Sequence, residues 1–266
     1  QLGSEAANRT SNNPVMNTFD DRSWETEHNY GLAYPFLAGN PDDGLAIGGG
    51  YIYTTYAFKK APFSTRHSFN GVYAFETSGW DINYQGEFLN VLGRWDVLAR
   101  AELQGPLYTR NYFGLGNNST YWLDNDENEE TFIRMREQLY GAYPALRRRF
   151  NDNVSISFGG TIEAIQIEDT QERFVRSNNP ETPEIRPAVF DGQAFAGGEF
   201  QLNFLNADNP VNPTQGLRFN ATAGWKTNLA ETGRSFGYFG GSLGFYFGNN
   251  RAVLASHVGA RRGGRL

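Results

Sequence analysis

The sequence contains no cysteine, which excludes a disulfide framework and any thiolate metal site. It has no apolar run long enough for a membrane-spanning helix, which needs roughly 20 residues. It also lacks a basic surface. The net charge is -6, and the only basic cluster is the final ARRGGRL. A nucleic-acid partner is therefore not expected.

What the sequence does have is glycine and aromatic residues in a period of two. It carries 31 Gly, 14 Tyr and 21 Phe, a composition typical of strands and tight turns. In WDINYQGEF, which starts at Trp80, apolar residues and polar residues alternate strictly. WDVLARAEL from Trp95 and GLRFNATAGWK from Gly216 repeat the pattern. Each segment predicts a strand with one polar face and one apolar face.

Weaker alternation predicts eight more strands, at about residues 28–37, 44–60, 64–78, 131–149, 153–168, 191–206, 236–248 and 250–260. The total is about eleven. Many have ten or more residues, which matches the roughly nine to eleven needed to cross a bilayer with tilt. Residues 1–27 are polar and aperiodic, so they are expected to be a lead-in or linker before a barrel over 28–266.

The connections support an up-and-down arrangement. Every second one includes the two long ones, about 105–130 and 169–190, whereas the others are mostly tight. Outer-membrane barrels have short turns at one end and long loops at the other. The expected fold class is therefore all-β, an antiparallel up-and-down transmembrane β-barrel. A soluble sandwich or lectin, with the apolar face inside, is the alternative. Rings near strand ends favour the barrel, where they would form interface girdles: Trp80, Trp95, Trp225 and Tyr246.

Three short motifs stand between the strands, and their residues are ordinary turn formers. NPDDGLAIGGG contains Asp42, Asp43 and Gly44; RNYFGLGNNS contains Asn111, Phe113, Gly114, Gly116 and Asn117; NPVNPTQGLRF contains Asn212, Pro213 and Gly216. A phosphate-binding role for the Gly-x-Gly pair is disfavoured, because an acidic stretch and no helix follows it. Phe113 is expected to anchor its loop to the barrel wall.

Together and in this order, the motifs resemble the surface-antigen barrel of the BamA/TamA outer-membrane superfamily. The likeness is to its Bacteroidota versions, some of which follow a phosphoesterase domain. The resemblance implies a sixteen-stranded barrel, so a chain with about eleven strands is expected to be C-terminally incomplete. It also implies a location in the outer membrane, with lipid and lipopolysaccharide around the barrel.

The function implied by the resemblance is assembly, insertion or translocation of outer-membrane or surface proteins through a seam at the first strand. Client outer-membrane proteins or other envelope subunits would then be partners. The candidate seam residues are Tyr30, Leu32, Tyr34 and Pro35, and Pro35 lacks a ladder donor, as suits a weak edge. An anchor for an attached phosphoesterase-like domain and a passive porin remain as alternatives.

No catalytic, cofactor or metal site is expected, and the chain is not predicted to be an enzyme. The three histidines are far apart, and Glu163 and Glu168 have no sequence reason to converge. Arg147, Arg148 and Arg149 must alternate faces, and we expect them at an interface. By the same alternation, five polar residues are expected to line the lumen: Arg100, Glu102, Arg218, Asn220 and Lys226.

Overall fold

The computed structural model describes residues 28–40, 43–57, 60–113, 132–170, 173–176, 190–209, 212–231, 234–249 and 252–265. These residues form one antiparallel sheet of eleven strands, each bonded to its neighbours in sequence. The strands are β1 (Tyr30–Asn40), β2 (Gly44–Ala57), β3 (Lys60–Ala74), β4 (Trp80–Leu92), β5 (Trp95–Asn111), β6 (Arg134–Arg149), β7 (Val154–Ile167), β8 (Gln193–Ala207), β9 (Gly216–Asn228), β10 (Phe236–Asn249) and β11 (Ala252–Arg265). The predicted all-β, antiparallel up-and-down arrangement and the number of about eleven strands are confirmed. The described strands form an open sheet, so closure into a transmembrane barrel stays a prediction.

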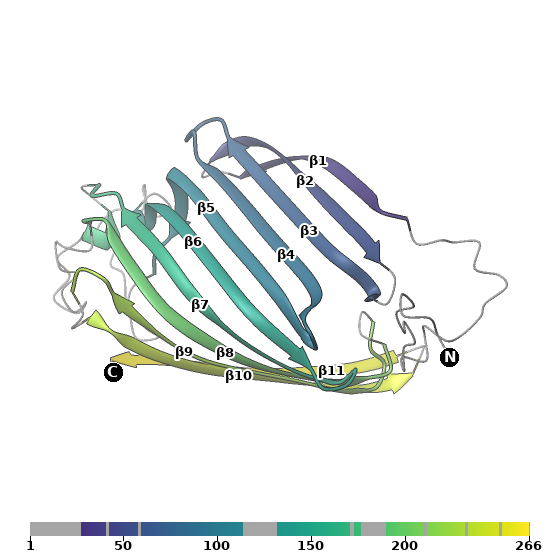
Figure 1. Cartoon of the computed structure of the whole chain (residues 1–266). Coiled ribbons are helices and arrows are strands. Elements are labelled where there is room, and N and C mark those ends of the chain that lie inside the picture. The colour runs from purple at the N-terminus through teal and green to yellow at the C-terminus, as the bar shows by residue number, and fades with distance from the viewer. Residues whose placement is uncertain are drawn as a thin grey trace, which may run out of the picture.

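The sheet is strongly curved and open. Figure 1 shows it as an open half-barrel, with β1 at one edge and β11 at the other. In the described part of the chain, β1 pairs only with β2 and β11 only with β10. The predicted edges at 28–37 and 250–260 are therefore the two edges of the sheet.

The connections separate by length as the sequence predicts. Those after β5 and β7 are the long ones, and they leave from the end of the sheet that we call the loop end. At the opposite end, called the turn end, β4 and β5 are separated by Gly93 and Arg94 alone. None of the helical segments among the described residues is long and apolar enough to cross a membrane.

Strand β5 is longer than the sequence analysis predicts, since residues 105–111 were expected to be loop. The pairing with β6 shifts between Gln104 and Tyr108 and then continues to Asn111, opposite Arg134. Gly105 sits in this irregularity, and a Cβ built there would collide with the Trp80 indole nitrogen. Gly105 therefore makes room for the Trp80 ring inside a bulge, which in the sequence looks like the start of a turn.

A small apolar cluster lies at the loop end, outside the sheet. The short 3-10 helix η1 (Phe174–Arg176) buries Phe174, whose ring lies 5.7 Å from that of Tyr112 and 5.5 Å from that of Phe132. These rings come from both long connections. The cluster therefore ties their described ends together above β5 and β6.

Candidate functional site

The two faces of the sheet differ in chemistry. Residues directly opposite one another on paired strands share a face, so the registers assign every strand position to one of the two faces. One face carries side chains that contact each other across an intervening strand. Lys226 on β9 bonds Glu163 on β7 at 2.7 and 2.5 Å, and the Tyr238 hydroxyl on β10 donates to Glu199 on β8 at 2.7 Å. Side chains converge in this way on the concave side of a curved sheet, so we call this the concave face.

Two similar Arg-Tyr-Glu groups stand on the concave face. The Arg100 guanidinium lies over the Tyr143 ring, 4.1 Å from its centroid, and the Tyr143 hydroxyl is hydrogen-bonded to Glu163. In the second group, Arg261 lies 5.1 Å from the Tyr238 centroid, and Tyr238 donates to Glu199. In each group a cation stacks on a ring whose hydroxyl is held by a carboxylate.

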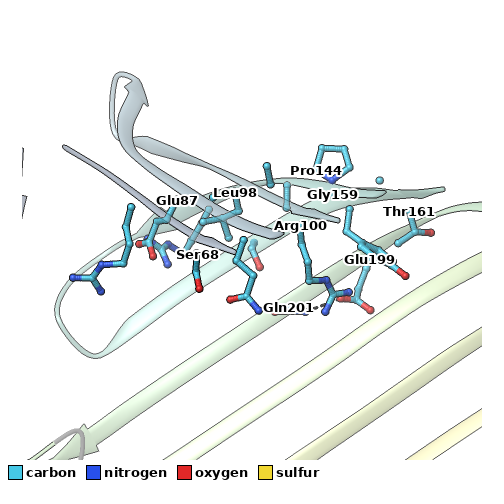
Figure 2. A pocket seen from close by; sticks show the side chains of 18 residues that line it. Ser68, Glu87, Leu98, Arg100, Pro144, Gly159, Thr161, Glu199 and Gln201 are labelled. Carbon is cyan, nitrogen blue, oxygen red and sulfur yellow. Dashed lines mark hydrogen bonds and ion pairs between the residues drawn. The ribbon is translucent and has the colours of Figure 1, made fainter. Parts of the chain in front are cut away.

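Both groups line one hollow of about 470 Å³, which extends over β5 to β11. A neighbouring hollow of about 400 Å³ shares Arg100, Tyr143 and Glu199, and Figure 2 shows Arg100, Gln201 and Glu199 close together in it. Gln201 donates to Glu199 at 2.6 Å. The concave face is therefore polar and hydrogen-bonded through its centre.

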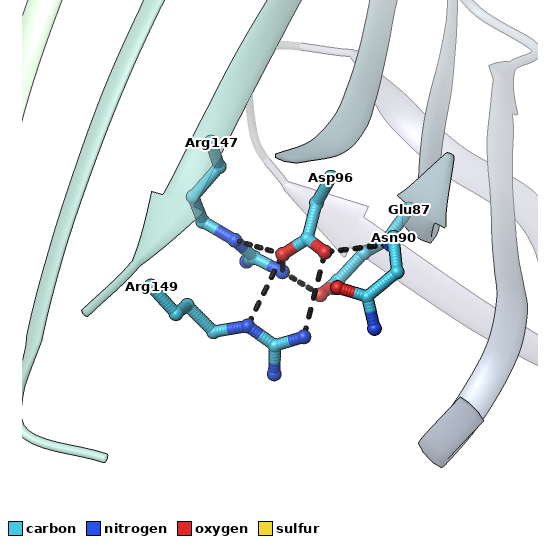
Figure 3. A network of polar contacts seen from close by, with 5 residues as sticks. All are labelled: Glu87, Asn90, Asp96, Arg147 and Arg149. Atoms are coloured by element: carbon cyan, nitrogen blue, oxygen red, sulfur yellow. Dashed lines mark hydrogen bonds and ion pairs between the residues drawn. The ribbon is translucent and has the colours of Figure 1, made fainter. Parts of the chain in front are cut away.

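A cluster of ion pairs around the buried Asp96 lies on the concave face at the turn end (Figure 3). Asp96 on β5 is 1% exposed and accepts from Arg147 at 2.8 and 3.0 Å and from Arg149 at 3.2 Å. Its other oxygen accepts from the backbone N–H of Asn90, which has a positive φ of 51°. Arg147 also pairs with Glu87 on β4. The cluster joins β4, β5 and β6 where β4 turns into β5.

The three consecutive arginines of β6 alternate faces, as the sequence predicts, and their location at an interface stays a prediction. Arg148 lies on the other face, 5.6 Å from the centroid of the Trp95 ring. Arg147 and Arg149 instead hold Asp96 on the concave face. Sequence analysis missed this role because Asp96 lies 51 residues before Arg147, and only the β5–β6 register brings them opposite each other.

A second polar cluster lies near the loop end of β5. Arg110 pairs with Glu137 at 3.1 Å and approaches Glu102 at 3.9 Å. Gln104 donates to Asp81 at 3.1 Å and accepts from Arg110 at 3.0 Å. Ion pairs and hydrogen bonds thus connect β4, β5 and β6 on the concave face near both ends of these strands.

The convex face is apolar along the strands. Its exposed large side chains include Ile82, Leu103, Phe158, Ile162, Phe200, Trp225, Phe239 and Phe245. Phe88, Val97 and Trp225 belong to the apolar positions of the three strictly alternating segments, and the registers place all three on this face. Tyr246 was expected beside the tryptophans of an interface girdle, but it lies opposite Gly216 and Ala255 on the concave face. The period of two counted from Phe236 explains this, since Tyr238 and Tyr246 share a parity.

The five predicted lumen residues all lie on the concave face. Arg100 and Glu102 alternate along β5, while Arg218, Asn220 and Lys226 alternate along β9. The structure brings Lys226 to Glu163 and Asn220 to Ser242 at 3.3 Å. Sequence analysis missed the acidic partners Glu163 and Glu199, although their alternate spacing along β7 and β8 is the same signal.

Strand β1 carries the predicted seam residues. Tyr30, Leu32 and Tyr34 share the concave side, while Pro35 lies on the convex side opposite Gly49. Phe36 and Tyr34 lean over glycines of β2. A Cβ at Gly48 would collide with the Phe36 ring, and one at Gly50 would collide with the Tyr34 ring. The rings of β1 are therefore packed on β2, and among the described strands none pairs with the outer edge of β1.

The turn motifs occupy connections. Gly44 begins β2 with a φ of 67°, and Asp43 accepts from the Thr77 hydroxyl at 3.2 Å. Gly216 begins β9 with a φ of 131°, which suits glycine. Asn212 and Pro213 lie in the connection before it. Asn111 ends β5, and Phe113 lies just beyond it with 56% of its surface exposed. The loop that Phe113 was expected to anchor lies outside the described residues, so its anchoring stays a prediction. Asp42, Gly114, Gly116 and Asn117 lie outside the described residues.

The connection from β8 to β9 is organised by Asp208. Its carboxylate accepts from the Thr214 hydroxyl at 2.5 Å and from the backbone N–H groups of Thr214, Gln215 and Asn209 at 2.9, 3.1 and 3.0 Å. These bonds, first that from the Thr214 side chain, lower the pKa of Asp208 to about 2. Asp208 thereby fixes the turn that contains Pro213.

The three histidines lie in described segments that are far apart in the sequence. His67 lies on the convex face, where Nδ1 is 3.0 Å from the Tyr84 hydroxyl and its ring meets that of Phe88. Across the described ranges, no group of three or more His, Asp or Glu residues is arranged to hold a metal ion. The features that stand out are the two faces and the two edges of the sheet.

Outer-membrane β-barrels have walls of this general kind, up-and-down sheets with one polar face and one apolar face. No protein-family model and no curated protein matches the sequence. Among solved structures, the sheet is similar to BamA from Haemophilus ducreyi lacking POTRA domains 1-3, with a TM-score of 0.55 and 16% identity. The match covers 90% of this chain and 42% of that one. The chain thus spans less than half the length of this neighbour, and the likeness shows the fold.

Proposed function

We propose that the sheet is part of an outer-membrane β-barrel, with its convex face against lipid and its concave face lining the interior. The observation that carries this proposal is the distribution of charge. On the convex face of the described strands the arginines lie toward strand ends, with Arg148 at the turn end and Arg134, Arg136 and Arg262 toward the loop end. The strands are 11 to 17 residues long, enough to cross the bilayer with tilt.

The proposed activity is help with the insertion or translocation of other outer-membrane proteins. A barrel can do this if a free strand edge pairs with a strand of the incoming protein, as in β-augmentation. Edge β1 supports this reading, because its outer row of backbone groups is unpaired in the described sheet while its rings hold it to β2. The likeness of the fold to BamA supports the same reading.

Strand direction constrains what can pair with the edges. β1 and β11 are both odd-numbered strands of an up-and-down sheet, so they run in the same direction. An antiparallel partner of either edge must run the other way, and antiparallel closure requires an odd number of strands between them. Five strands, which would complete the sixteen that the resemblance implies, satisfy this condition.

Site-specific photo-cross-linking of the full-length protein in cells tests the activity. Leu37 on β1 and Ile47 on β2 lie directly opposite each other on the convex face, so they form a matched pair. A cross-linking amino acid at Leu37 should capture newly made outer-membrane proteins, and one at Ile47 should not, because β2 has a neighbour on each side. Equal capture at both positions, or none at Leu37 in a correctly folded barrel, would count against the proposal.

A passive pore is the second candidate, favoured by the polar hollows on the concave face. Conductance of the purified full-length protein in a planar bilayer distinguishes the two. Steady single-channel currents without client capture at Leu37 would favour the pore.

A further inference from the structure

A trough crosses the convex face between β7 and β11. One row of directly opposed residues contains three phenylalanines and one alanine and ends in a cation: Phe158, Phe200, Ala223, Phe239 and Arg262. The next row toward the loop end consists of glycines around one indole: Gly160, Gly198, Trp225, Gly237 and Gly264. Beside these rows is a hollow of about 700 Å³, whose lining includes Phe158, Phe200, Trp225, Gly237, Phe239 and Arg262.

The indole of Trp225 forms one wall of this trough. It leans toward β8, since a Cβ at Gly198 would lie 2.5 Å from its Cη2 atom. The ring remains 53% exposed. Gly237, on the other side of Trp225, leaves the floor open toward Phe239 and Arg262. A long apolar chain therefore has rings to lie against and bare backbone beneath it.

Arg262 is chemically isolated on this face. The convex positions of β7 to β11 are otherwise apolar, small or uncharged in the described strands, and Arg262 is the charged residue among them. The described residues provide it with no carboxylate partner. It lies three residues before the end of β11, at the loop end of the apolar band.

A guanidinium with free donors at the border of an apolar surface is suited to phosphate oxygens, which it can bind through two hydrogen bonds. We propose that this trough binds an anionic lipid, with the headgroup phosphate on Arg262 and an acyl chain against Trp225 and Phe239. The inference rests on the proposed function, because it requires the convex face to lie against lipid. Beyond the proposed function, this proposal names a class of lipid headgroup and the residues that bind it.

Native mass spectrometry of the detergent-solubilised full-length protein tests the proposal. Phosphatidylglycerol and phosphatidylcholine with identical acyl chains are added at equal concentrations, so the two lipids differ only in the headgroup, which is net negative in the first and net neutral in the second. The wild type should bind phosphatidylglycerol about fivefold more tightly, the ratio that corresponds to about 1 kcal/mol for one basic residue at a membrane surface. Arg262→Gln should remove this preference, and Phe239→Ala should weaken both lipids.

Arg100→Gln is the matched control, because it removes the same charge from the concave face and should leave the preference intact. The proposal is overturned if Arg262→Gln keeps the preference, if Arg100→Gln loses it, or if inorganic phosphate competes as well as the lipid does. Each variant is first checked for insertion into vesicles. A wild type that does not insert contradicts the proposed function, whereas normal insertion without a headgroup preference contradicts only the lipid site.

Discussion

Lys226 on β9 reaches across β8 and bonds both carboxylate oxygens of Glu163 on β7, at 2.7 and 2.5 Å. Strands two apart in a sheet are separated by roughly 9.6 Å. Their side chains meet only where the sheet curves toward them. The contact between Lys226 and Glu163 is therefore a consequence of the curvature of the sheet, and it also stabilises that curvature.

Removing the cation of this pair should destabilise the sheet. Lys226→Met leaves Glu163, which is 7% exposed, buried without its cation. The free energy of unfolding should fall by about 3 kcal/mol, as for other broken buried pairs. Denaturant titration in lipid vesicles measures it. Adding Glu163→Gln should restore most of the loss, because an amide keeps an acceptor for Tyr143 without a buried charge. No recovery in the double variant would contradict this explanation.

The two faces should differ in their tolerance of charge. Asn220 and Ala221 are neighbours on β9 that point to opposite faces. Ala221→Lys places a cation on the convex face and should cost about 2–4 kcal/mol if it lies near the bilayer midplane. Asn220→Lys, on the concave face, should cost little. Folding titrations into vesicles compare the two variants, and equal costs would argue against a lipid-facing convex surface.

The turn between β4 and β5 should depend on Asp96. Asp96→Asn weakens the charged acceptor that binds the Asn90 N–H at 2.9 Å. Hydrogen bonds to charged groups contribute about 1.5–3 kcal/mol, so exchange of the Asn90 amide should accelerate about tenfold or more. Hydrogen–deuterium exchange measures this rate. Glu87→Gln should have a smaller effect, since it leaves Asp96 and both its arginines in place; an equal effect would show that Glu87 holds the turn.

Asp208 should make the stability of its turn depend on pH. Its pKa falls from the ordinary aspartate value of 3.8 to about 2 in the folded protein, so the unfolded chain binds the proton more readily. The stabilisation is therefore fully present above about pH 4 and is lost as pH falls through about 2. Asp208→Ala should unfold at lower denaturant concentration than wild type at pH 7, and the difference should disappear near pH 2. A difference that stays constant would exclude ionised Asp208 as its cause.

The regular strands were predictable because apolar and polar residues alternate along them with a period of two. Trp80 to Phe88 and Leu217 to Trp225 each place one chemistry on one face, and the register preserves this across the sheet. The end of β5 was not predictable, because Gly105 looks like a turn until the Trp80 ring is placed above it. For Tyr246, nearness to a strand end is a misleading guide to its face, whereas its parity along β10 assigns the face correctly.

For the candidate site, the sequence predicts which face of the sheet each residue lies on, but not which residues it contacts. Arg100, Arg218 and Lys226 follow from alternation alone, but their partners lie on other strands at separations that no local pattern encodes. Lys226 and Glu163 are 63 residues apart, and they meet because β8 places them two strands from each other on a curved sheet. Register and curvature are collective properties, so contacts such as Arg147 with Asp96 become visible only in the folded sheet.

The most direct test of the account uses the absence of cysteine from the sequence. Single cysteines at Leu243 and Ser242 lie next to each other on β10 and point to opposite faces. In the full-length protein, with any cysteine outside this sequence replaced by serine and reconstituted into lipid nanodiscs, a water-soluble maleimide should label Ser242→Cys and spare Leu243→Cys, whereas a lipid-dissolved maleimide should do the reverse. Equal labelling by both reagents, or the opposite assignment of faces, would contradict a barrel wall with lipid on its convex side.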